Sequence, residues 1–212
     1  MPESLLPFYY IILEYLDNLD SKTPEDADDS VIKQLDLLLD YLRSENQSYF
    51  ATIDAQLANK EISFDYLRAI LIPGREFYIT DSSTGQPRAV ILRKATKHQS
   101  QMTWYYSLSC EYLESYGDAP SKPTDETRGR FGRASYSSTI NQYKGTRKIN
   151  SFSCFPMEYH LRKDEIRRML IERGKRWASY DGMHHITYTG IGYQGGGKHY
   201  VRVLQLDEHP KS

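Results

Sequence analysis

Hydrophobic residues recur at helical spacing through the first sixty positions of the chain. The spacing predicts a helix over residues 5–19 with one apolar face formed by Phe8, Ile12, Tyr15, Leu16 and Leu19. A polar, acidic break over residues 21–30 follows. A second helix is then predicted from the stripe Val31, Leu35, Leu38, Leu39 and Leu42, and a third helical stretch over residues 47–59.

From Glu61 onward the helical spacing is replaced by β-rich, tyrosine-containing runs. Ser63 occupies the capping position of a short helix over 64–70, which Pro73-Gly74 would end. The runs predict strands over 76–80, 88–94, 102–112 and 130–143, and a closing hairpin over 183–192 and 199–206. One late helix is predicted over 164–180, with a buried face of Ile166, Met169, Leu170 and Trp177.

The order of these elements predicts an α+β fold and argues against alternating βαβ units. We expect a helical N-terminal region over residues 1–60. A β-rich domain over 61–208 would follow, with a mainly antiparallel sheet and the late helix packed on it.

Composition and charge narrow the class of protein. Aromatic residues make up 13% of the chain, with 18 tyrosines, which argues against a disordered chain. The net charge of −1 hides an asymmetry, because residues 1–72 hold 14 acidic and 5 basic side chains and residues 73–212 hold 14 acidic and 22 basic ones. Such a split can mark a nucleic-acid-binding half, or two halves of one chain that attract each other.

The two cysteines, Cys110 and Cys154, are too few for a disulfide scaffold and favour a reducing compartment. The first residues carry no basic stretch, and the apolar run over 9–13 is too short for a signal peptide or a membrane span. We therefore expect a soluble intracellular protein, cytoplasmic or nuclear, with no membrane partner.

A glycine-rich segment from Gly192 to Lys198 fits the first seven positions of the phosphate-binding P-loop. The eighth position holds His199, where a P-loop needs serine or threonine to place a hydroxyl on Mg²⁺. The residues that follow alternate like a strand, whereas a P-loop opens a helix. We interpret the segment as a hairpin loop and expect no nucleotide or other cofactor.

Metal and nucleophile chemistry are weakly supported. His184 and His185 are adjacent, so on a strand they point to opposite faces and cannot readily join His199 around one ion. Cys154 and His160 could form a nucleophilic pair, although the phenylalanines beside the thiol favour a buried cysteine. We therefore assign no catalytic and no metal-binding residue, and keep a cysteine-dependent enzyme as the second alternative.

Two features point to binding. Arginines and lysines alternate with aromatic residues over 128–148, a pattern that suits phosphate neutralisation and base stacking. The late helix is also rich in basic residues between Arg162 and Arg176. The simpler interpretation of both is a solvated surface that complements the acidic N-terminal helices.

Six segments of the second part of the chain form a recognisable series. They are Glu61-Ile-Ser-Phe-Asp-Tyr-Leu-Arg-Ala-Ile-Leu-Ile-Pro-Gly74, Gly85-Gln-Pro-Arg88, Leu108-Ser-Cys-Glu-Tyr112, Tyr143-Lys-Gly-Thr-Arg147 with Ile149, Phe155-Pro-Met-Glu-Tyr-His160 and Leu170-Ile-Glu-Arg-Gly-Lys-Arg-Trp177. This series resembles the uncharacterised domain upstream of the ATPase module in large filamentous-fungal AAA+ ATPases. These segments keep their order and span about residues 61–206. The resemblance implies an accessory domain without ATP hydrolysis, and it transfers no catalytic residue.

By analogy with other AAA+ machines, such a domain would recognise a substrate or adaptor protein. We therefore predict a non-catalytic protein-interaction and regulatory domain, with a nucleic-acid-binding module as the first alternative. The oligomeric state stays open. Because Trp, Tyr and Arg often anchor interfaces, the predicted partner-binding residues are Trp104, Tyr106, Arg130, Arg133, Tyr136 and Arg147. Alternation along the strand predicts that Trp104 and Tyr106 share one face and that Tyr105 takes the other.

Overall fold

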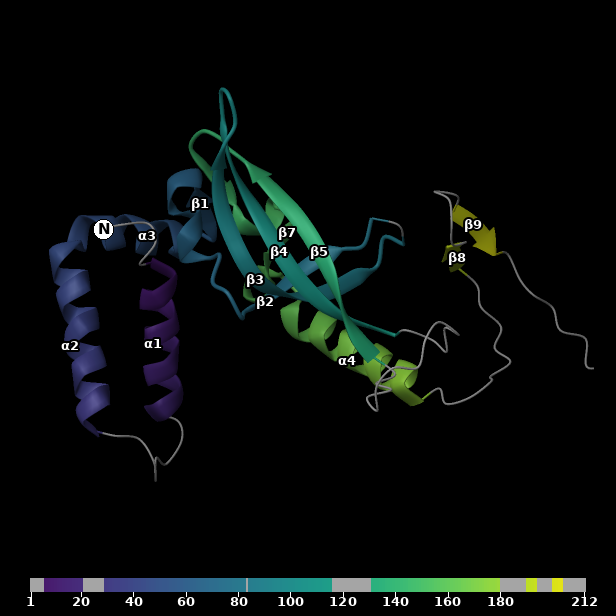
Figure 1. Ribbon diagram of the computed structural model, residues 1–212, viewed down its shortest axis with the longest axis horizontal. Helices are drawn as coiled ribbons and strands as arrows, with labels where there is room; N and C mark the ends of the chain where they lie inside the picture. The colour runs from purple at the N-terminus through teal and green to yellow at the C-terminus, as the bar shows by residue number, and fades with distance from the viewer. Residues whose placement is uncertain are drawn as a thin grey trace, which may run out of the picture. The chain divides into compact units, whose positions relative to one another are not determined.

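The computed structural model describes residues 6–20, 29–82, 84–115, 131–179, 190–193 and 200–203. The chain divides into two compact units, residues 1–78 with 89–160 and residues 79–88 with 161–212. Figure 1 shows helices first, then a sheet, then one late helix. The predicted α+β class with antiparallel strands is confirmed.

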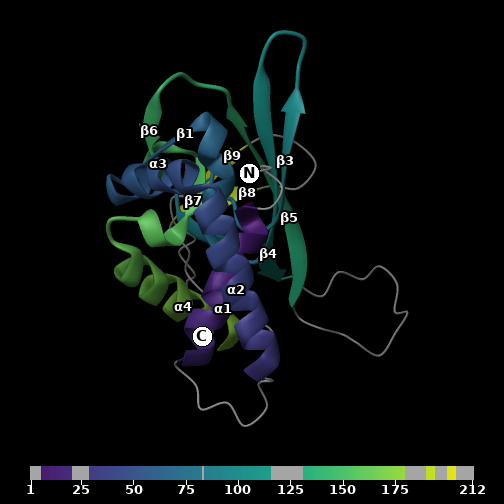
Figure 2. The ribbon, with the colours of Figure 1, turned by 90° about the vertical axis from the view of Figure 1, so that its left-hand side faces the viewer.

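Three helices begin the first unit: α1 (Leu6–Asp20), α2 (Asp29–Glu45) and α3 (Gln47–Ala58). α1 and α2 lie side by side in Figures 1 and 2. Their buried faces meet those of α3 in one hydrophobic cluster of Leu6, Tyr9, Leu16, Leu39, Phe50 and Ile53. Arg43 ties the three helices together, donating hydrogen bonds to the Tyr9 hydroxyl at 3.1 Å and to Asp54 at 2.7 Å.

The predicted buried faces of α1 and α2 are partly wrong. Phe8 is 63% exposed and Tyr15 is also exposed, whereas Leu6 and Tyr9 are buried. The reason is that α1 carries large apolar residues on opposite sides, so its periodicity is compatible with more than one buried face. On α2, Leu39 is buried as predicted, but Val31 and Leu38 are exposed.

A five-stranded sheet has the order β5-β4-β3-β2-β7. Its strands are β2 (Glu76–Thr80), β3 (Pro87–Gln99), β4 (Trp104–Ser115), β5 (Phe131–Asn141) and β7 (Cys154–Pro156). β3 pairs antiparallel with β4 with one register shift between Leu92 and Lys94, and β4 pairs antiparallel with β5 without a shift. Alternate residues of β4, Tyr106, Leu108 and Cys110, are buried, so this face of the sheet carries the core.

Short elements connect the sheet to the helices. β1 (Glu61–Ser63) and β6 (Thr146–Lys148) form a separate antiparallel ribbon, which the sequence pattern did not predict. The helix predicted over 64–70 is a 3-10 helix, η1 (Phe64–Ala69). Ala69 belongs to the helical cluster, while the Phe64 ring lies 5.3 Å from the Tyr106 ring on the sheet. η1 therefore links the two parts of the core, and η2 (Ile149–Ser151) and η3 (Met157–Tyr159) follow later in the chain.

The second unit contains α4 (Lys163–Ser179) and the strands β8 (Gly190–Tyr193) and β9 (Tyr200–Val203). The two strands pair antiparallel, so the hairpin predicted around the glycine-rich segment is confirmed where the structure describes it. On α4, Ile166 is buried as predicted, but Met169 is exposed and Trp177 is 55% exposed, which corrects the predicted face. Within the described residues, the helices lack the length and apolar character needed to cross a membrane.

Candidate functional site

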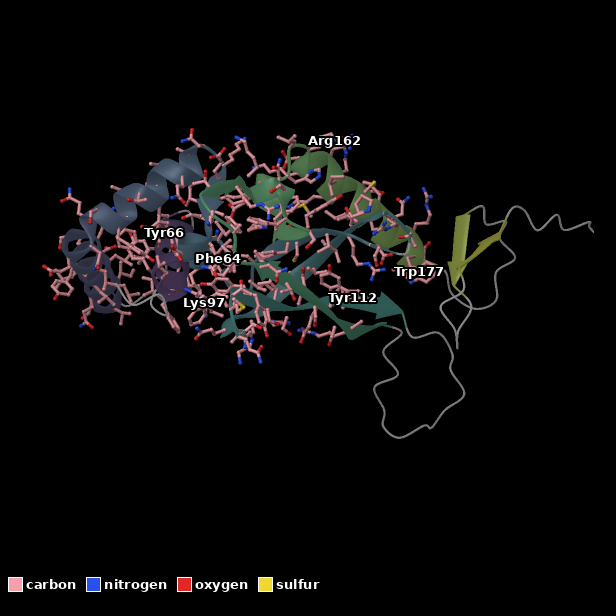
Figure 3. All side chains as sticks on the ribbon, turned by 90° about the horizontal axis from the view of Figure 1, so that it is seen from above. Phe64, Tyr66, Lys97, Tyr112, Arg162 and Trp177 are labelled. Carbon is pink, nitrogen blue, oxygen red and sulfur yellow. The ribbon has the colours of Figure 1, made fainter. Side chains whose placement is uncertain are left out.

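Three basic side chains of the first unit lie over a connected series of aromatic rings. We call this group the aromatic–basic cluster. It comprises the cations Arg68, Lys97 and Arg147 and the rings of Phe64, Trp104, Tyr106, Tyr143 and Phe152. The cations come from η1, β3 and β6, three segments that are distant in the sequence. Figure 3 shows Phe64 and Lys97 next to each other, one from η1 and one from β3.

Strand pairing positions the first half of the cluster. Lys97 of β3 faces Tyr106 of β4, and Gln99 faces Trp104, so Lys97 reaches both aromatic residues on one face of the sheet. The Lys97 Nζ lies 5.4 Å from the centre of the Trp104 ring, 5.7 Å from that of Phe64 and 6.0 Å from that of Tyr106. These distances suit cation–π attraction, which restrains the ammonium group over the rings.

Arg68 approaches the same aromatic group from η1. Its guanidinium carbon lies 5.7 Å from the centre of the Tyr106 ring, so this ring contacts two cations. Arg68 is partly exposed, and Tyr106 is 0% exposed. A buried ring therefore supports a charge that remains accessible to solvent.

A glycine turn positions the second half of the cluster. Gly145 has a φ of +70°, a conformation that favours glycine, and it directs the chain from β5 into β6. The Arg147 guanidinium then lies 5.3 Å from the ring centres of both Tyr143 and Phe152. The Phe64 ring joins the two halves, since its centre is 5.9 Å from that of Tyr143.

A hydrogen bond to β1 fixes the side chain of Tyr143. Its hydroxyl donates a hydrogen bond of 2.9 Å to the Ile62 carbonyl of β1. Burial raises the pKa of Tyr143, and the positive charge of Arg147 opposes that shift. The phenol therefore stays neutral at physiological pH and acts as a structural donor.

The charge of the cluster is only partly neutralised. Among the residues that the structure describes, neither Arg68 nor Arg147 has a carboxylate within ion-pair distance. Elsewhere in this unit, Arg75 pairs with Glu158 at 3.1 Å and Lys148 pairs with Glu61 at 3.1 Å. The two arginines of the cluster are thus restrained positive charges that are available to an anionic group.

The predicted site residues Trp104 and Arg147 lie in this cluster. Trp104 is 37% exposed and Arg147 is exposed. The prediction that Trp104 and Tyr106 share a face opposite Tyr105 is confirmed by the pairing register. The assignment of Tyr106 to a partner-binding surface is wrong, because Tyr106 is fully buried beneath Lys97 and Arg68.

The other predicted site residues do not join the cluster. Arg133 and Tyr136 lie on opposite faces of β5, since they differ by an odd number of positions. Tyr136 is half-buried and faces Cys110. The single surface predicted for these residues is therefore wrong, and Arg130 lies outside the described residues.

Arg133 instead has a structural partner. Glu111 accepts hydrogen bonds from Arg93 at 2.9 Å and from Arg133 at 3.1 Å. The bond to Arg93, followed by that to Arg133, lowers the pKa of the Glu111 carboxyl. The two exposed arginines and the half-buried glutamate link β3, β4 and β5 across the sheet.

We expect a pH-dependent contribution from Glu111 to stability. Its lowered pKa means that the contribution is present above the unfolded-state pKa and is lost as pH falls through the folded-state pKa. A Glu111→Gln variant should therefore have a slightly lower thermal midpoint than wild type near neutral pH, with the difference disappearing in acid. Thermal unfolding across pH measures this, and a difference that grows in acid would contradict it.

The structure gives little support to Cys154 as a nucleophile. Cys154 and Cys110 are both free and 0% exposed. A hydrogen bond with Cys110, together with burial, raises the pKa of the Cys154 thiol, whereas a nucleophilic cysteine needs a lowered one. The His160 ring packs against Tyr78 at 4.5 Å and Phe155 at 6.1 Å.

No three metal-ligating side chains gather in the part of the chain that the structure describes. The candidates His184, His185 and His199 lie outside that part.

Sequence reasoning missed Arg68 and Lys97, because each is an isolated basic residue in its own segment. It did detect the alternation of basic and aromatic residues that includes Tyr143 and Arg147.

Comparison with known proteins gives one match. Residues 52–161 match a family described as "Domain of unknown function (DUF7025)". The match runs from within α3 to just beyond η3 and includes every residue of the aromatic–basic cluster. No curated protein and no solved structure matches the chain. Because the matched segment covers more than half of the 212 residues, the chain belongs to the DUF7025 family.

Proposed function

We propose that this chain is a non-catalytic protein-interaction and regulatory domain. In this proposal the aromatic–basic cluster binds an acidic segment of a substrate or adaptor protein. The observation that carries it is the placement of Arg68, Lys97 and Arg147 over connected rings, with no carboxylate paired to either arginine among the described residues.

The cation–π contacts favour recognition because they restrain the basic side chains before a partner arrives. Flexible Lys and Arg side chains lose rotamer entropy on binding, and restraint in the free protein reduces that cost. Each guanidinium can then offer paired N–H donors to one carboxylate. Trp104, at the exposed edge of the cluster, adds the kind of aromatic anchor that is frequent at interfaces.

The same geometry argues against the nucleic-acid alternative. Single-stranded nucleic acid binds by stacking bases on accessible ring faces. Phe64, Tyr106 and Phe152 are buried, and their rings contact cations of this chain. Of the two remaining rings in the cluster, Tyr143 is half-buried and Trp104 is exposed. A carboxylate-rich peptide fits the available charges better than a row of bases.

The resemblance to the region upstream of the ATPase module in fungal AAA+ ATPases supports the regulatory part of the proposal. Two of its segments carry cluster residues: Glu61–Gly74 contains Phe64 and Arg68, and Tyr143–Arg147 contains Tyr143 and Arg147. On this proposal the chain recognises proteins for an AAA+ motor and does not itself hydrolyse ATP.

Binding of labelled probes tests the proposal. The probes are an oligo-glutamate peptide containing one tryptophan and an oligo-dT strand, compared by fluorescence anisotropy. We expect the peptide to bind wild type, and the Arg68→Glu/Arg147→Glu variant to bind it about tenfold or more weakly. The matched control is Lys33→Glu/Lys94→Glu, which reverses two exposed charges outside the cluster and should retain binding.

Affinity capture from cell lysate, with and without nuclease, then identifies the partner. Proteins retained after nuclease by wild type and by the control variant, but lost by the cluster variant, support the proposal. Equal loss in both variants would show that general charge is responsible and would contradict the assigned site. Stronger binding of oligo-dT than of the peptide, with a steep salt dependence, would favour nucleic acid.

A further inference from the structure

β5 is an edge strand with one open side. It lies at the end of the sheet order and pairs with β4 along all eleven of its residues. The opposite edge strand, β7, has three residues, all buried, and ends in Pro156, which has no N–H to offer. The short proline-containing edge resists further pairing, whereas the long edge has no such protection.

The register shows which backbone groups of β5 point to the open side. The Gln142 N–H donates to the Trp104 carbonyl at 2.9 Å, and the pairing continues without a shift to Ser115 and Phe131. In an antiparallel ladder every second residue bonds to the neighbouring strand. Even-numbered residues of β5 therefore bond to β4, and the backbone groups of Ser135, Ser137 and Thr139 point outward.

These outward groups remain available. Across the residues that the structure describes, the N–H and C=O groups of Ser135, Ser137 and Thr139 make no hydrogen bond. Their side chains are exposed, small and uncharged, and Arg133 is the one charged residue of β5. Natural sheets usually protect such an edge with charge, proline or a bulge, and otherwise pair it.

We propose that a second copy of this chain pairs with the open edge, β5 against β5, antiparallel and two-fold symmetric about Tyr136. Ser135 would then face Ser137 of the other copy, and Arg133 would face Thr139. Four facing pairs from Arg133 to Thr139 would form about eight backbone hydrogen bonds, two for each pair. The interface is distinct from the aromatic–basic cluster and does not depend on the function proposed for it.

A second copy fits this edge because β5 is compatible with itself. Two-fold pairing sets the same patch against itself, so it fails where like charges meet. Here the single charged residue, Arg133, meets a threonine, and small serines meet serines. On the other face Tyr136 would lie beside Tyr136 of the second copy, an aromatic cross-strand pair that stabilises a sheet. The sheet would continue across the symmetry axis.

The oligomeric state of the full chain tests this proposal, measured by sedimentation and light scattering over a range of concentrations. We expect wild type to reach twice its 24.7 kDa. Ser137→Pro removes one outward N–H without touching the bonds to β4, so it should be monomeric, and Ser137→Ala should remain dimeric. Circular dichroism confirms that each variant is folded.

A charge-swap pair keeps the test valid even if the proline variant unfolds. Ser135→Lys/Ser137→Lys sets lysine against lysine in the proposed register and should be monomeric, as should Ser135→Glu/Ser137→Glu. Mixing the two should restore a dimer with one copy of each. The proposal would be overturned if wild type stayed monomeric at every concentration, even if that monomer bound an extended peptide at the open edge. It would also be overturned if the lysine and glutamate variants still formed dimers on their own.

Discussion

Replacing Tyr106 with alanine should destabilise the protein by about 3–5 kcal/mol, the usual cost of deleting a large buried aromatic side chain. Tyr106 is fully buried, contacts the Phe64 ring and lies under two cations. Its loss would leave a cavity and remove the support of Lys97 and Arg68. Urea unfolding followed by circular dichroism gives the change in the free energy of unfolding.

Trp104→Ala is the matched control for that variant. Trp104 lies two residues away on the same face of β4, but it is partly exposed, so the expected cost is about 1–2 kcal/mol. Its removal should weaken partner binding more than it weakens stability. Equal destabilisation by the two variants would contradict the assignment of Tyr106 to the core and Trp104 to the surface.

Both cysteines should react with iodoacetamide on the order of a hundredfold more slowly in the native protein than in urea. Cys110 and Cys154 are fully buried, and the raised pKa of Cys154 keeps its thiol protonated near neutral pH. Thiolate, not thiol, is the reactive species, so burial and protonation both slow the labelling of Cys154. At Cys110 the hydrogen bond with Cys154 lowers the pKa, so burial alone slows its labelling. Mass spectrometry of peptides after timed labelling measures each site separately.

A second result would reopen the question of enzyme chemistry. Rapid labelling of Cys154 in the folded protein, with Cys110 still protected, would require an accessible thiolate. It would support the cysteine-dependent alternative and count against a purely binding role. Circular dichroism before labelling, together with slow labelling of Cys110 in the same sample, serves as the control for the folded state.

Local pattern predicted the strands well because alternation and turn residues act over a few positions. β2 has the predicted bounds, and β3, β4 and β5 differ from the prediction at their ends. The three-residue strands β1, β6 and β7 were not predicted, because segments this short have too few residues to show a period. Their pairing depends on partners far along the chain.

Local pattern was weakest where it had to choose a buried face. α1 is apolar on opposite sides, so its sequence is compatible with several orientations, and packing against α2, α3 and η1 selected Leu6 and Tyr9. For α4, the helix was predicted correctly but Trp177 is exposed. A hydrophobic side chain is compatible with burial, but whether it is buried depends on which other elements of the fold pack against it.

The amino-acid sequence alone established the α+β class and the order of the main elements, because these rest on periodicity. It also identified Trp104 and Arg147 as candidates. Tertiary packing placed Tyr106 in the core and Arg133 on the opposite face of the sheet. It also brought Arg68, Lys97 and Arg147 over one set of rings. These three residues meet through contacts between distant segments, which no local spacing encodes.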